Sequence, residues 1–260
     1  MDLDDDQLLR YSRQIMLPQV DAAGQMRLLE STVLVVGLGG LGAPVAMYLA
    51  AAGVGHLVLC DDDEVDLSNL QRQIVHATPD VGRTKVASAR DALLDLNPDV
   101  TVTTVPTRLE GEALRERVAQ ADVVVDACDN FTTRFAVNEA CFASGTPLVS
   151  GAAIRFEGQV AVFDPRDDNS PCYRCLYRDG GELDETCTQS GVFTPVVGII
   201  GSLQATEALK LLIGIGETLT GRLLLLDAET MQTRTIRLPR DPECPVCDRH
   251  RAARPMHQAT

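Results

Sequence analysis

The stretch VVGLGGLGAP, residues 35–44, joins two apolar segments of different character. Before it, Thr32–Val36 has the continuous apolar composition of a buried strand, and after it Ala43–Ala52 has the composition of a helix. Backbone amides in a glycine-rich turn between a strand and a helix point at an anion, helped by the helix dipole. The stretch therefore predicts a phosphate site of the nucleotide-binding kind. The glycines concerned are Gly37, Gly39, Gly40 and Gly42.

Apolar strand patterns alternate with helix patterns through the first 150 residues. Strands are expected at Thr32–Val36, His56–Cys60, Val100–Val105, Asp122–Ala127 and Pro147–Ser150, and helices at Ala43–Ala52, Lys85–Leu94, Gly111–Ala119 and Phe135–Ala143. Strands rich in valine and leucine, separated by helices, are typical of a parallel sheet that is covered on both faces. The sequence predicts an α/β, Rossmann-like, largely parallel sheet with helices on both faces.

The two ends of the chain have other patterns. At the N-terminus we expect short helices interrupted at Pro18 and Gly24, with a partial apolar stripe. After Gly151 the chain continues as an antiparallel second half. Its elements are expected at Gln159–Asp164, Gly198–Leu212, Arg222–Asp227 and Thr233–Leu238. We predict one domain over residues 1–250, with a helical arm (1–30), a nucleotide-binding half (31–150), a second half (151–250) and a disordered tail (251–260).

Composition restricts the possible functions. The 260 residues are 45% hydrophobic, which is typical of a globular protein. A net charge of −14 repels nucleic-acid backbones, although a local group of arginines can still bind one nucleotide. The acidic start Met1–Asp6 is unlike a secretory or transit peptide, and the longest apolar run, near Val196–Ile200, is broken by glycine well short of the roughly 20 residues of a membrane span. We expect a cytoplasmic protein with no nucleic-acid or membrane partner.

Charged residues after the second predicted strand indicate which nucleotide binds. Asp61 follows the strand His56–Cys60, 19 positions after Gly42, where a carboxylate can bind ribose hydroxyls. Arg72 and Lys85 follow in the stretches SNLQRQ and GRTK. Two cations suit a triphosphate, whose developing negative charge must be neutralised, better than a dinucleotide. Two alternatives stay open: the glycines can serve only the backbone conformation of the turn, and both cations can be surface charges.

Several motifs occur in order between Arg10 and Cys247, over nearly the whole chain. They are GLGGLG, CDDDEVDLSNLQRQ, GRTK, DACDN at Asp126–Asn130 and two Cys-x-x-Cys pairs. Together they resemble the MoeB/ThiF/HesA family, the bacterial relatives of ubiquitin-activating enzymes. The resemblance implies an adenylyltransferase that uses ATP and magnesium. Its substrate would be the C-terminal glycine of a small ubiquitin-fold sulfur-carrier protein, and pyrophosphate would be released.

The resemblance also implies roles for individual residues. The glycine turn would approach the nucleotide, Asp61 would bind the ribose, and Asp129 would hold magnesium beside Asn130. Arg13 would reach from the second subunit of a homodimer into its partner's ATP site. The residues implied for the phosphates and their surroundings are Ser68, Asn69, Arg72 and Lys85. Because the attacking carboxylate is already ionised near neutral pH, no catalytic histidine is expected.

Four of the eight cysteines form two Cys-x-x-Cys pairs, Cys172 with Cys175 and Cys244 with Cys247. Four thiolates match a tetrahedral structural zinc site, which here would close a large loop of the chain. Redox-active pairs and buried spectator thiols are the alternatives. The remaining residues Cys60, Cys128 and Cys141 are expected in the core, on apolar strands or helices.

The carrier pathway is less clearly indicated than the reaction. The stretches LVSGAAIRFEGQ and GSLQATE look closer to the molybdopterin branch of the family, with sulfur coming from a separate donor protein. The alternative is the thiamine branch, in which Cys187 would be a reactive thiol; a plain loop thiol is equally compatible with its surroundings. Phe156, Val160 and Val162 could receive the carrier, or could be core residues of an alternating strand.

Two functions from other classes also fit part of the sequence. An NAD-dependent dehydrogenase is supported by the glycine turn and Asp61. A non-catalytic scaffold would retain the nucleotide fold without activity. The presence of Arg13, Arg72, Lys85 and Asp129 favours the adenylating enzyme over both.

Overall fold

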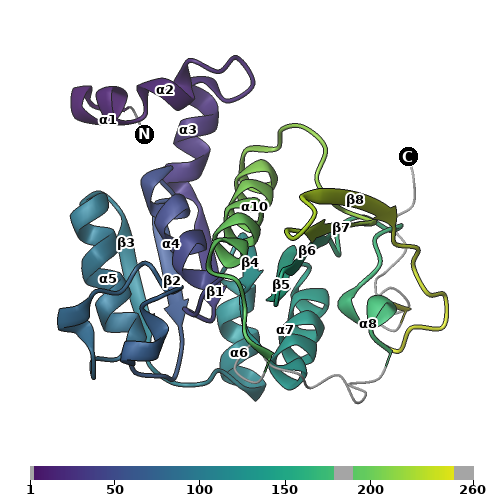
Figure 1. Cartoon of the computed structure of the whole chain (residues 1–260). Coiled ribbons are helices and arrows are strands. Elements are labelled where there is room, and N and C mark those ends of the chain that lie inside the picture. The colour runs from purple at the N-terminus through teal and green to yellow at the C-terminus, as the bar shows by residue number, and fades with distance from the viewer. Residues whose placement is uncertain (1–2, 179–189, 249–260) are drawn as a thin grey trace.

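The computed structural model describes residues 3–178 and 190–248. One eight-stranded sheet runs through these residues in the order β3-β2-β1-β4-β5-β6-β7-β8 (Figure 1). Neighbours from β3 to β5 are parallel, and β6, β7 and β8 continue the sheet antiparallel. The strands are β1 Thr32–Val36, β2 His56–Cys60, β3 Thr101–Val105, β4 Val123–Asp126, β5 Leu148–Ile154, β6 Glu157–Phe163, β7 Arg222–Asp227 and β8 Gln232–Arg237. The predicted α/β fold with an antiparallel continuation is confirmed.

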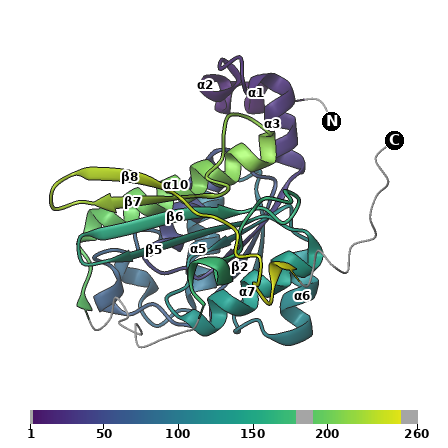
Figure 2. The ribbon, with the colours of Figure 1, turned by 90° about the vertical axis from the view of Figure 1, so that its right-hand side faces the viewer.

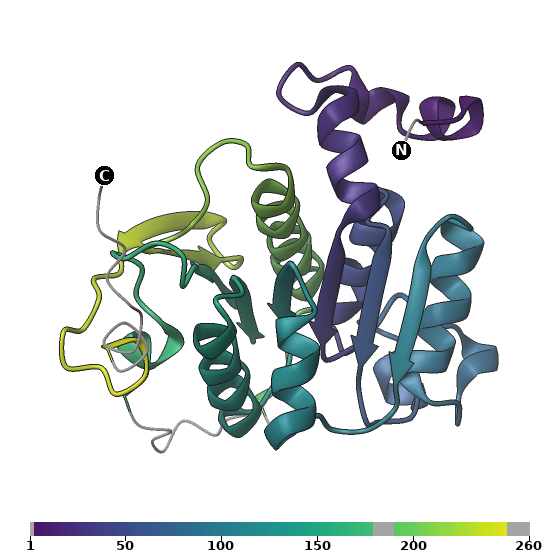
Figure 3. The same cartoon turned by 180° about the vertical axis from the view of Figure 1, so that it is seen from behind.

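Helices cover both faces of the sheet. On one face lie α4 (Gly42–Ala51), α5 (Lys85–Leu96) and α10 (Thr194–Ile213), and on the other lie α6 (Gly111–Ala119) and α7 (Phe131–Ser144). Strand β1 shows why both are needed: Val33 and Val35 pack into the first core, whereas Leu34 and Val36 pack into the second. Because side chains alternate along a strand, a strand that is apolar at every position must be covered twice. Figure 3 shows α6 and α7 from behind.

Two predicted helices begin earlier in the structure than in the sequence pattern. Helix α7 begins at Phe131 rather than Phe135, because the side chain of Asn130 accepts a hydrogen bond from the backbone N–H of Thr133 and caps the helix. Helix α10 begins at Thr194 rather than Gly198 and has a proline in its first turn, where no hydrogen bond is lost. The other predicted elements agree with the structure to within a few residues.

Helix α10 corrects the expectation about long apolar segments. It continues through Gly198 and Gly201 for 20 residues and is, by length and composition, long and apolar enough to cross a membrane. Half of its most apolar window is buried in the molecule, against α4, β5 and β6. A Cβ atom at Gly201 would lie 2.5 Å from Cγ of Pro44, so this glycine serves close packing between α10 and α4. Packing inside the protein therefore accounts for the apolar character of α10.

The N-terminal arm consists of α1 (Asp5–Arg10), α2 (Ser12–Ile15) and α3 (Asp21–Glu30). Pro18 lies between α2 and α3 as expected, but Gly24 lies inside α3 and does not interrupt it. A Cβ atom at Gly24 would lie 2.9 Å from Cγ2 of Ile213, so this glycine lets α3 approach the end of α10. The arm stands at one end of the molecule, opposite the end at which the parallel strands terminate (Figure 1).

The second half is built differently from the first. Strands β6, β7 and β8 lie side by side, with β8 at the outer edge (Figure 2). Every residue of β8 is exposed, whereas every residue of β4 is buried. The short helix α8 (Tyr173–Leu176) packs against α7; it contains Cys175, and Cys172 is its N-cap residue. Val160 and Val162 are buried core residues, and Phe156 is 40% exposed.

Candidate active site

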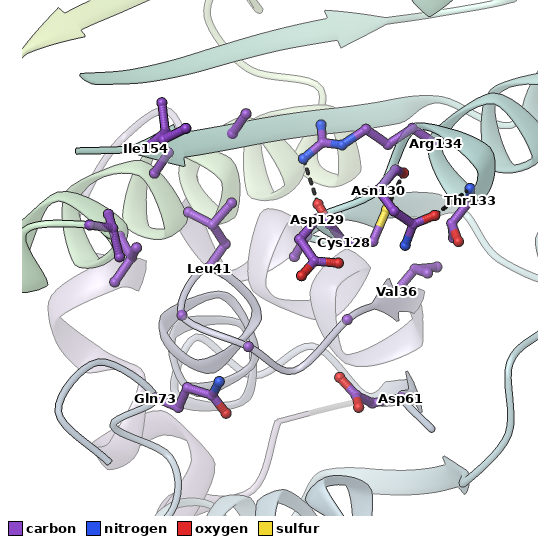
Figure 4. Close-up of a pocket in the computed structure, with 18 of the residues that line it drawn as sticks. Val36, Leu41, Asp61, Gln73, Cys128, Asp129, Asn130, Thr133, Arg134 and Ile154 are labelled. Carbon is purple, nitrogen blue, oxygen red and sulfur yellow. Dashed lines mark hydrogen bonds between the residues drawn. The ribbon is translucent and has the colours of Figure 1, made fainter. Parts of the chain in front are cut away.

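A cavity of about 860 Å³ opens at the carboxyl ends of β1, β2 and β4. Strand β1 lies between β2 and β4, so the connection after β1 leaves to one side of the sheet and the connection after β4 to the other. Such a switch point leaves a crevice between neighbouring loops, and ligands of open α/β sheets bind there. Figure 4 shows Val36, Asp61 and Cys128 around this cavity.

The glycine turn forms the floor of the cavity between β1 and α4. Gly37 has a φ of +93°, and a Cβ atom there would lie 2.8 Å from the carbonyl oxygen of Ala127. A Cβ atom at Gly42 would overlap the carbonyl oxygen of Gly37. The turn therefore needs glycine at both positions, whatever binds above it. Of the four predicted glycines, Gly37, Gly39 and Gly40 line the cavity, and Gly42 instead begins α4.

Asp61 is held in place at the end of β2 by backbone amides. Its Oδ2 accepts a hydrogen bond of 2.6 Å from the N–H of Leu38 in the glycine turn, and its Oδ1 accepts one of 2.9 Å from the N–H of Asp63. Burial raises the pKa of Asp61, although Lys85 and the two amides oppose this shift. The carboxylate thus connects β2 to the glycine turn and lines the cavity, where it can accept hydrogen bonds from hydroxyls.

Both predicted cations line the same cavity. Lys85, the first residue of α5, is only 5% exposed, and its Nζ lies 2.7 Å from Oδ2 of the exposed Asp63. Arg72 is half-buried and donates a hydrogen bond of 3.2 Å from Nη1 to the carbonyl of Ser68. A lysine is almost never buried without a reason such as a charged partner. The interpretation of Lys85 as a surface charge is therefore wrong, and Arg72 also faces the cavity.

A short 3-10 helix, η1 (Leu67–Asn69), carries two more of the predicted residues. Ser68 and Asn69 line the cavity. The side chain of Asn69 accepts a hydrogen bond of 3.1 Å from the N–H of Asp66, whose own side chain caps the helix. Gln73 follows in the same segment and is 3% exposed, and its Oε1 has no hydrogen-bond partner in the described part of the chain. Figure 4 shows Gln73 on the same side of the cavity as Asp61.

Asp129 and Asn130 lie on the loop between β4 and α7 and line the cavity. Asp129 is exposed, so its carboxylate is open to a ligand, while Asn130 is occupied in capping α7. Figure 4 shows Asp129 and Asp61 around the glycine turn. A carboxylate on the cavity surface is the kind of ligand that magnesium prefers.

A buried ion pair that the sequence did not reveal supports this loop. Arg134 on α7 is 6% exposed and Asp126 at the end of β4 is 1% exposed, with Nη1 and Oδ2 3.3 Å apart. Arg134 Nη2 also donates to the carbonyls of Cys128, at 2.5 Å, and Gly151, at 2.9 Å. Ser150 Oγ donates to Asp126 at 2.8 Å. Burial alone would lower the pKa of Arg134, but Asp126 outweighs it and the net shift is upward. The guanidinium therefore ties the loop after β4 to β5.

Cys128 lies at the cavity and not in the core as expected. It follows β4 instead of lying on it, is half-buried, and donates from Sγ to Oδ1 of Asp126 at 2.7 Å. Burial, together with the charge of Asp126, raises the pKa of the Cys128 thiol well above its usual value, so the group stays protonated. Cys60 and Cys141 are buried core residues as predicted.

The four paired cysteines come together at α8, next to α7. The Sγ atoms of Cys172, Cys175, Cys244 and Cys247 all lie within 4.8 Å of one another. The separations of 3.5 Å between Cys172 and Cys244 and 3.6 Å between Cys175 and Cys247 are too long for disulfides. In a regular tetrahedron with zinc–sulfur bonds of about 2.3 Å, the sulfurs are about 3.8 Å apart. The cluster thus has the donor set and spacing of a tetrahedral metal site.

One predicted site residue lies away from the cavity, and another lies outside the described residues. Arg13 is exposed on α2 in the N-terminal arm and does not line the cavity of its own chain. Cys187 lies outside the described residues, as do the predicted tail 251–260 and the loop around residue 187. Sequence reasoning missed Asp126, Cys128 and Arg134 as parts of the site. Arg134 follows the N-cap residue Asn130 by four positions, which places it one helical turn further along α7, and this spacing was the available signal.

The ThiF family matches residues 11–246, which is most of the chain. The chain belongs to the ThiF family. Its relatives include the molybdopterin-synthase adenylyltransferase of Escherichia coli, 50% identical over 95% of this chain and 98% of the relative, and the sulfur carrier protein ThiS adenylyltransferase of the same organism, 51% identical over 94% and 97%. The SAMP-activating enzyme E1 of Haloferax volcanii is 50% identical over 95% and 91%.

The relatives establish the class of enzyme, and a solved structure agrees on the fold. Because the relatives named adenylyltransferases match over nearly their full lengths, this ThiF-family chain is an adenylyltransferase. The structure of Escherichia coli MccB superimposes with a TM-score of 0.79 and 24% identity, over 92% of this chain and 73% of that one. The relatives named for molybdopterin synthase and for ThiS are equally similar, so identity does not choose between their pathways.

Proposed function

We propose that this ThiF-family enzyme uses ATP to adenylate the C-terminal glycine of a small ubiquitin-fold sulfur-carrier protein, giving an acyl-adenylate and pyrophosphate. The names of the similar relatives support a sulfur carrier as the substrate class. The observation that carries the proposal is that the nearly buried Lys85 and Arg72 line one cavity with the glycine turn and Asp61. Two cations suit the triphosphate of ATP better than the diphosphate of a nicotinamide dinucleotide.

Different residues of the cavity would bind different parts of an ATP molecule. Asp61 would accept hydrogen bonds from the ribose hydroxyls, and the amides of the glycine turn would face the phosphates. Arg72, Lys85 and Asn69 would hold the phosphate chain, with Ser68 beside them. Magnesium, held by Asp129, would supply further positive charge to the phosphates.

The reaction needs charge neutralisation more than proton transfer. A carboxylate and a triphosphate repel each other, so the cations must hold the two anions together in a water-poor site. Lys85 and Arg72 occupy such a position, since one is nearly buried and the other half-buried in the cavity wall. The attacking carboxylate is ionised near neutral pH and needs no base. The protonated Cys128 thiol would not compete with it as a nucleophile.

The finer assignments are proposals that follow from the sequence. We favour the molybdopterin branch, with sulfur supplied by a separate donor; in the thiamine alternative Cys187 would react with the carrier. Phe156, 40% exposed and in a tilted ring contact with Phe193 at a centroid distance of 5.1 Å, is the candidate for carrier contact, while Val160 and Val162 are in the core. We further propose that residues 1–250 act as one cytoplasmic adenylation domain with zinc on its four clustered cysteines.

A homodimer with Arg13 acting across the interface completes the proposal. Arg13 does not line the cavity of its own chain, and the arm lies at the opposite end of the sheet (Figure 1). We therefore propose that the cavity of a second copy receives this arginine.

Carrier-dependent exchange of pyrophosphate into ATP tests the proposed function. Arg72→Ala and Asp129→Ala should each lower exchange by about a hundredfold or more, because each removes charge that neutralises the transition state. The matched control is Arg83→Ala, in the same segment as Lys85, whose guanidinium pairs on the surface with Asp80 and Asp91. Exchange at the wild-type rate in either cavity variant would remove that residue from its role. Exchange that is absent in the wild-type protein with every candidate carrier would contradict the proposed function.

A further inference from the structure

The exposed Arg13 stands between side chains that fasten its helix to the body of the protein. Tyr11, immediately before α2, is 3% exposed, and its hydroxyl accepts a hydrogen bond of 2.9 Å from Nδ2 of the buried Asn97. Gln14, on α2 itself, donates hydrogen bonds from Nε2 to Oε1 of Gln25, at 2.7 Å, and to the carbonyl of Ala52, at 3.2 Å. The short helix α2, which makes few bonds of its own, is thus fixed on both sides of Arg13.

The partners of this fastening are the C-terminal ends of two helices that begin at the cavity. Helix α4 begins in the glycine turn and α5 begins at Lys85. Both run back along the sheet towards the end at which the parallel strands begin. There, Asn97 Nδ2 also donates to the carbonyl of Ala50, at 2.7 Å, and Arg10 Nη1 donates to the carbonyl of Leu96, at 3.2 Å. Side-chain donors at these positions satisfy carbonyls that have no partner within the helix, and a cation there is favoured by the helix dipole.

The Tyr11 ring occupies a space that is open only because residue 53 is a glycine. Gly53 has a φ of +87°, and a Cβ atom there would lie 2.7 Å from the Tyr11 ring and 2.6 Å from Nε2 of Gln25. The glycine that ends α4 therefore admits both the tyrosine ring and the glutamine to which Gln14 is bonded. Ring and amide together determine how α2 lies against the body.

Arg13 itself makes none of these fastening hydrogen bonds. It is exposed, its Nη1 lies 3.9 Å from Sδ of Met16, and no carboxylate in the described part of the chain lies within ion-pair distance of it. Its neighbours Leu9, Met16 and Leu17 are 75%, 70% and 52% exposed. Exposed apolar side chains on the same arm as an unpaired, exposed arginine are typical of a surface that a partner covers.

We propose that Tyr11 and Gln14 are positioning residues, which hold α2 so that Arg13 is presented to the cavity of a second copy of the chain. The inference rests on the cross-subunit role proposed for Arg13 and adds the side chains that make it possible. The arm is hydrogen-bonded to the ends of α4 and α5 of its own chain. Arg13 is therefore positioned by the chain to which it belongs, and not by the chain whose cavity receives it.

Mixed dimers test this inference, because donor and receiver of the arginine can be changed separately. Two differently tagged chains, Arg13→Ala and Arg72→Ala, are co-expressed and the mixed species is isolated by successive affinity steps. The Arg13→Ala chain keeps an intact cavity and the Arg72→Ala chain keeps an intact Arg13, so one complete site forms. Carrier-dependent pyrophosphate exchange should return to about half the wild-type rate, because one of two symmetric sites works.

Gln14→Ala is then added to one chain at a time. Added to the Arg72→Ala chain, which donates the arginine, it should lower the restored rate about tenfold or more, since a displacement of about 1 Å is enough for such a loss. Added to the Arg13→Ala chain, which donates the cavity, it should leave the restored rate unchanged. Tyr11→Phe, which retains the ring beside Gly53 and removes only the hydroxyl, should give the same asymmetry with a smaller loss.

The possible outcomes separate the inference from the proposal on which it rests. Equal losses from both placements of Gln14→Ala, or no loss from either, would overturn the positioning role while leaving the role of Arg13 intact. Failure of the Arg13→Ala and Arg72→Ala pair to regain activity would instead overturn the cross-subunit role of Arg13, and the positioning role with it. Because the same substitution is present in both placements, a general effect on folding cannot produce the asymmetry.

Discussion

The parallel part of the sheet and its antiparallel continuation are stabilised in different ways. In the parallel part, β4 is buried at every residue and the ion pair of Asp126 with Arg134 lies directly beneath the loop that carries Asp129. In the continuation, β8 is exposed at every residue, and a cluster of four thiols joins α8 to the end of the described chain. The ion pair of the parallel part therefore acts directly on a loop of the cavity, whereas the four cysteines do not line the cavity and reach it only through Tyr173 and Tyr177 beside them.

The largest expected effect is a loss of stability in the antiparallel continuation of the sheet. If the four clustered cysteines hold the proposed zinc, metal binding contributes to the folding free energy of this part, and removing ligands should unfold it. Cys172→Ser combined with Cys247→Ser should abolish metal binding and lower the free energy of unfolding by about 5 kcal/mol or more. Metal analysis of protein purified without chelator and thermal unfolding measure both effects.

The matched control is Cys60→Ala, which removes a buried thiol outside the cluster. It should cost about 1–2 kcal/mol and leave the metal content unchanged. A wild-type protein without metal, destabilised equally by both kinds of substitution, would show that the cluster is four ordinary core cysteines.

The next effect concerns the ion pair of the parallel part. Arg134→Met leaves the Asp126 carboxylate buried without its partner and should lower the free energy of unfolding by about 3–5 kcal/mol. Arg166→Met is the comparison, because Arg166 pairs with Asp164 at 2.7 Å but is 53% exposed, and it should cost no more than about 1 kcal/mol. Chemical denaturation of the two variants gives the difference. Similar losses would mean that burial of the Arg134 pair has no special consequence.

The smallest effect is the pH dependence that Asp61 contributes. Burial raises its pKa above the ordinary value of 3.8, so the folded protein binds this proton more tightly than the unfolded chain. Stability from this group therefore falls as pH rises through the interval above 3.8, and Asp61→Asn should remove that fall. Denaturation curves of both proteins across mildly acidic pH measure the difference. A wild-type protein whose stability rises more slowly with pH than that of the variant fits the account, and the opposite order contradicts it.

The sequence predicted the parallel part of the fold well because its signals are local. Continuous apolar strands such as Val33–Val36 and a glycine turn show both the element and its surroundings within a few residues. The packing of helices was harder to predict. Gly24 looks like a helix break in the sequence but lies inside α3, and Gly201 lies inside the predicted helix for a reason that the sequence does not show: in both cases another side chain occupies the space that a Cβ would need. That information resides in Ile213 and Pro44, far along the chain.

The candidate site likewise contains residues that local motifs predicted and residues that only the fold brings together. The glycine turn, Asp61, Arg72, Lys85 and Asp129 were predicted from motifs, and the structure brings them to one cavity. Arg134 was not predicted, because its partners Asp126, Cys128 and Gly151 are on different elements and only the fold brings them together. Cys128 was assigned to the core because the preceding strand is apolar, although the strand ends two residues earlier.

The binding of ATP and of adenosine to Lys85→Met tests the central claim most directly. The claim is that cations in the cavity hold the phosphate chain, while Asp61 and the glycine turn hold the rest of the nucleotide. Calorimetry should show ATP affinity weakened about tenfold or more, because a charge-assisted contact is lost, with adenosine affinity changed by no more than about twofold. Unchanged ATP affinity, or equal weakening of both ligands, would contradict the claim.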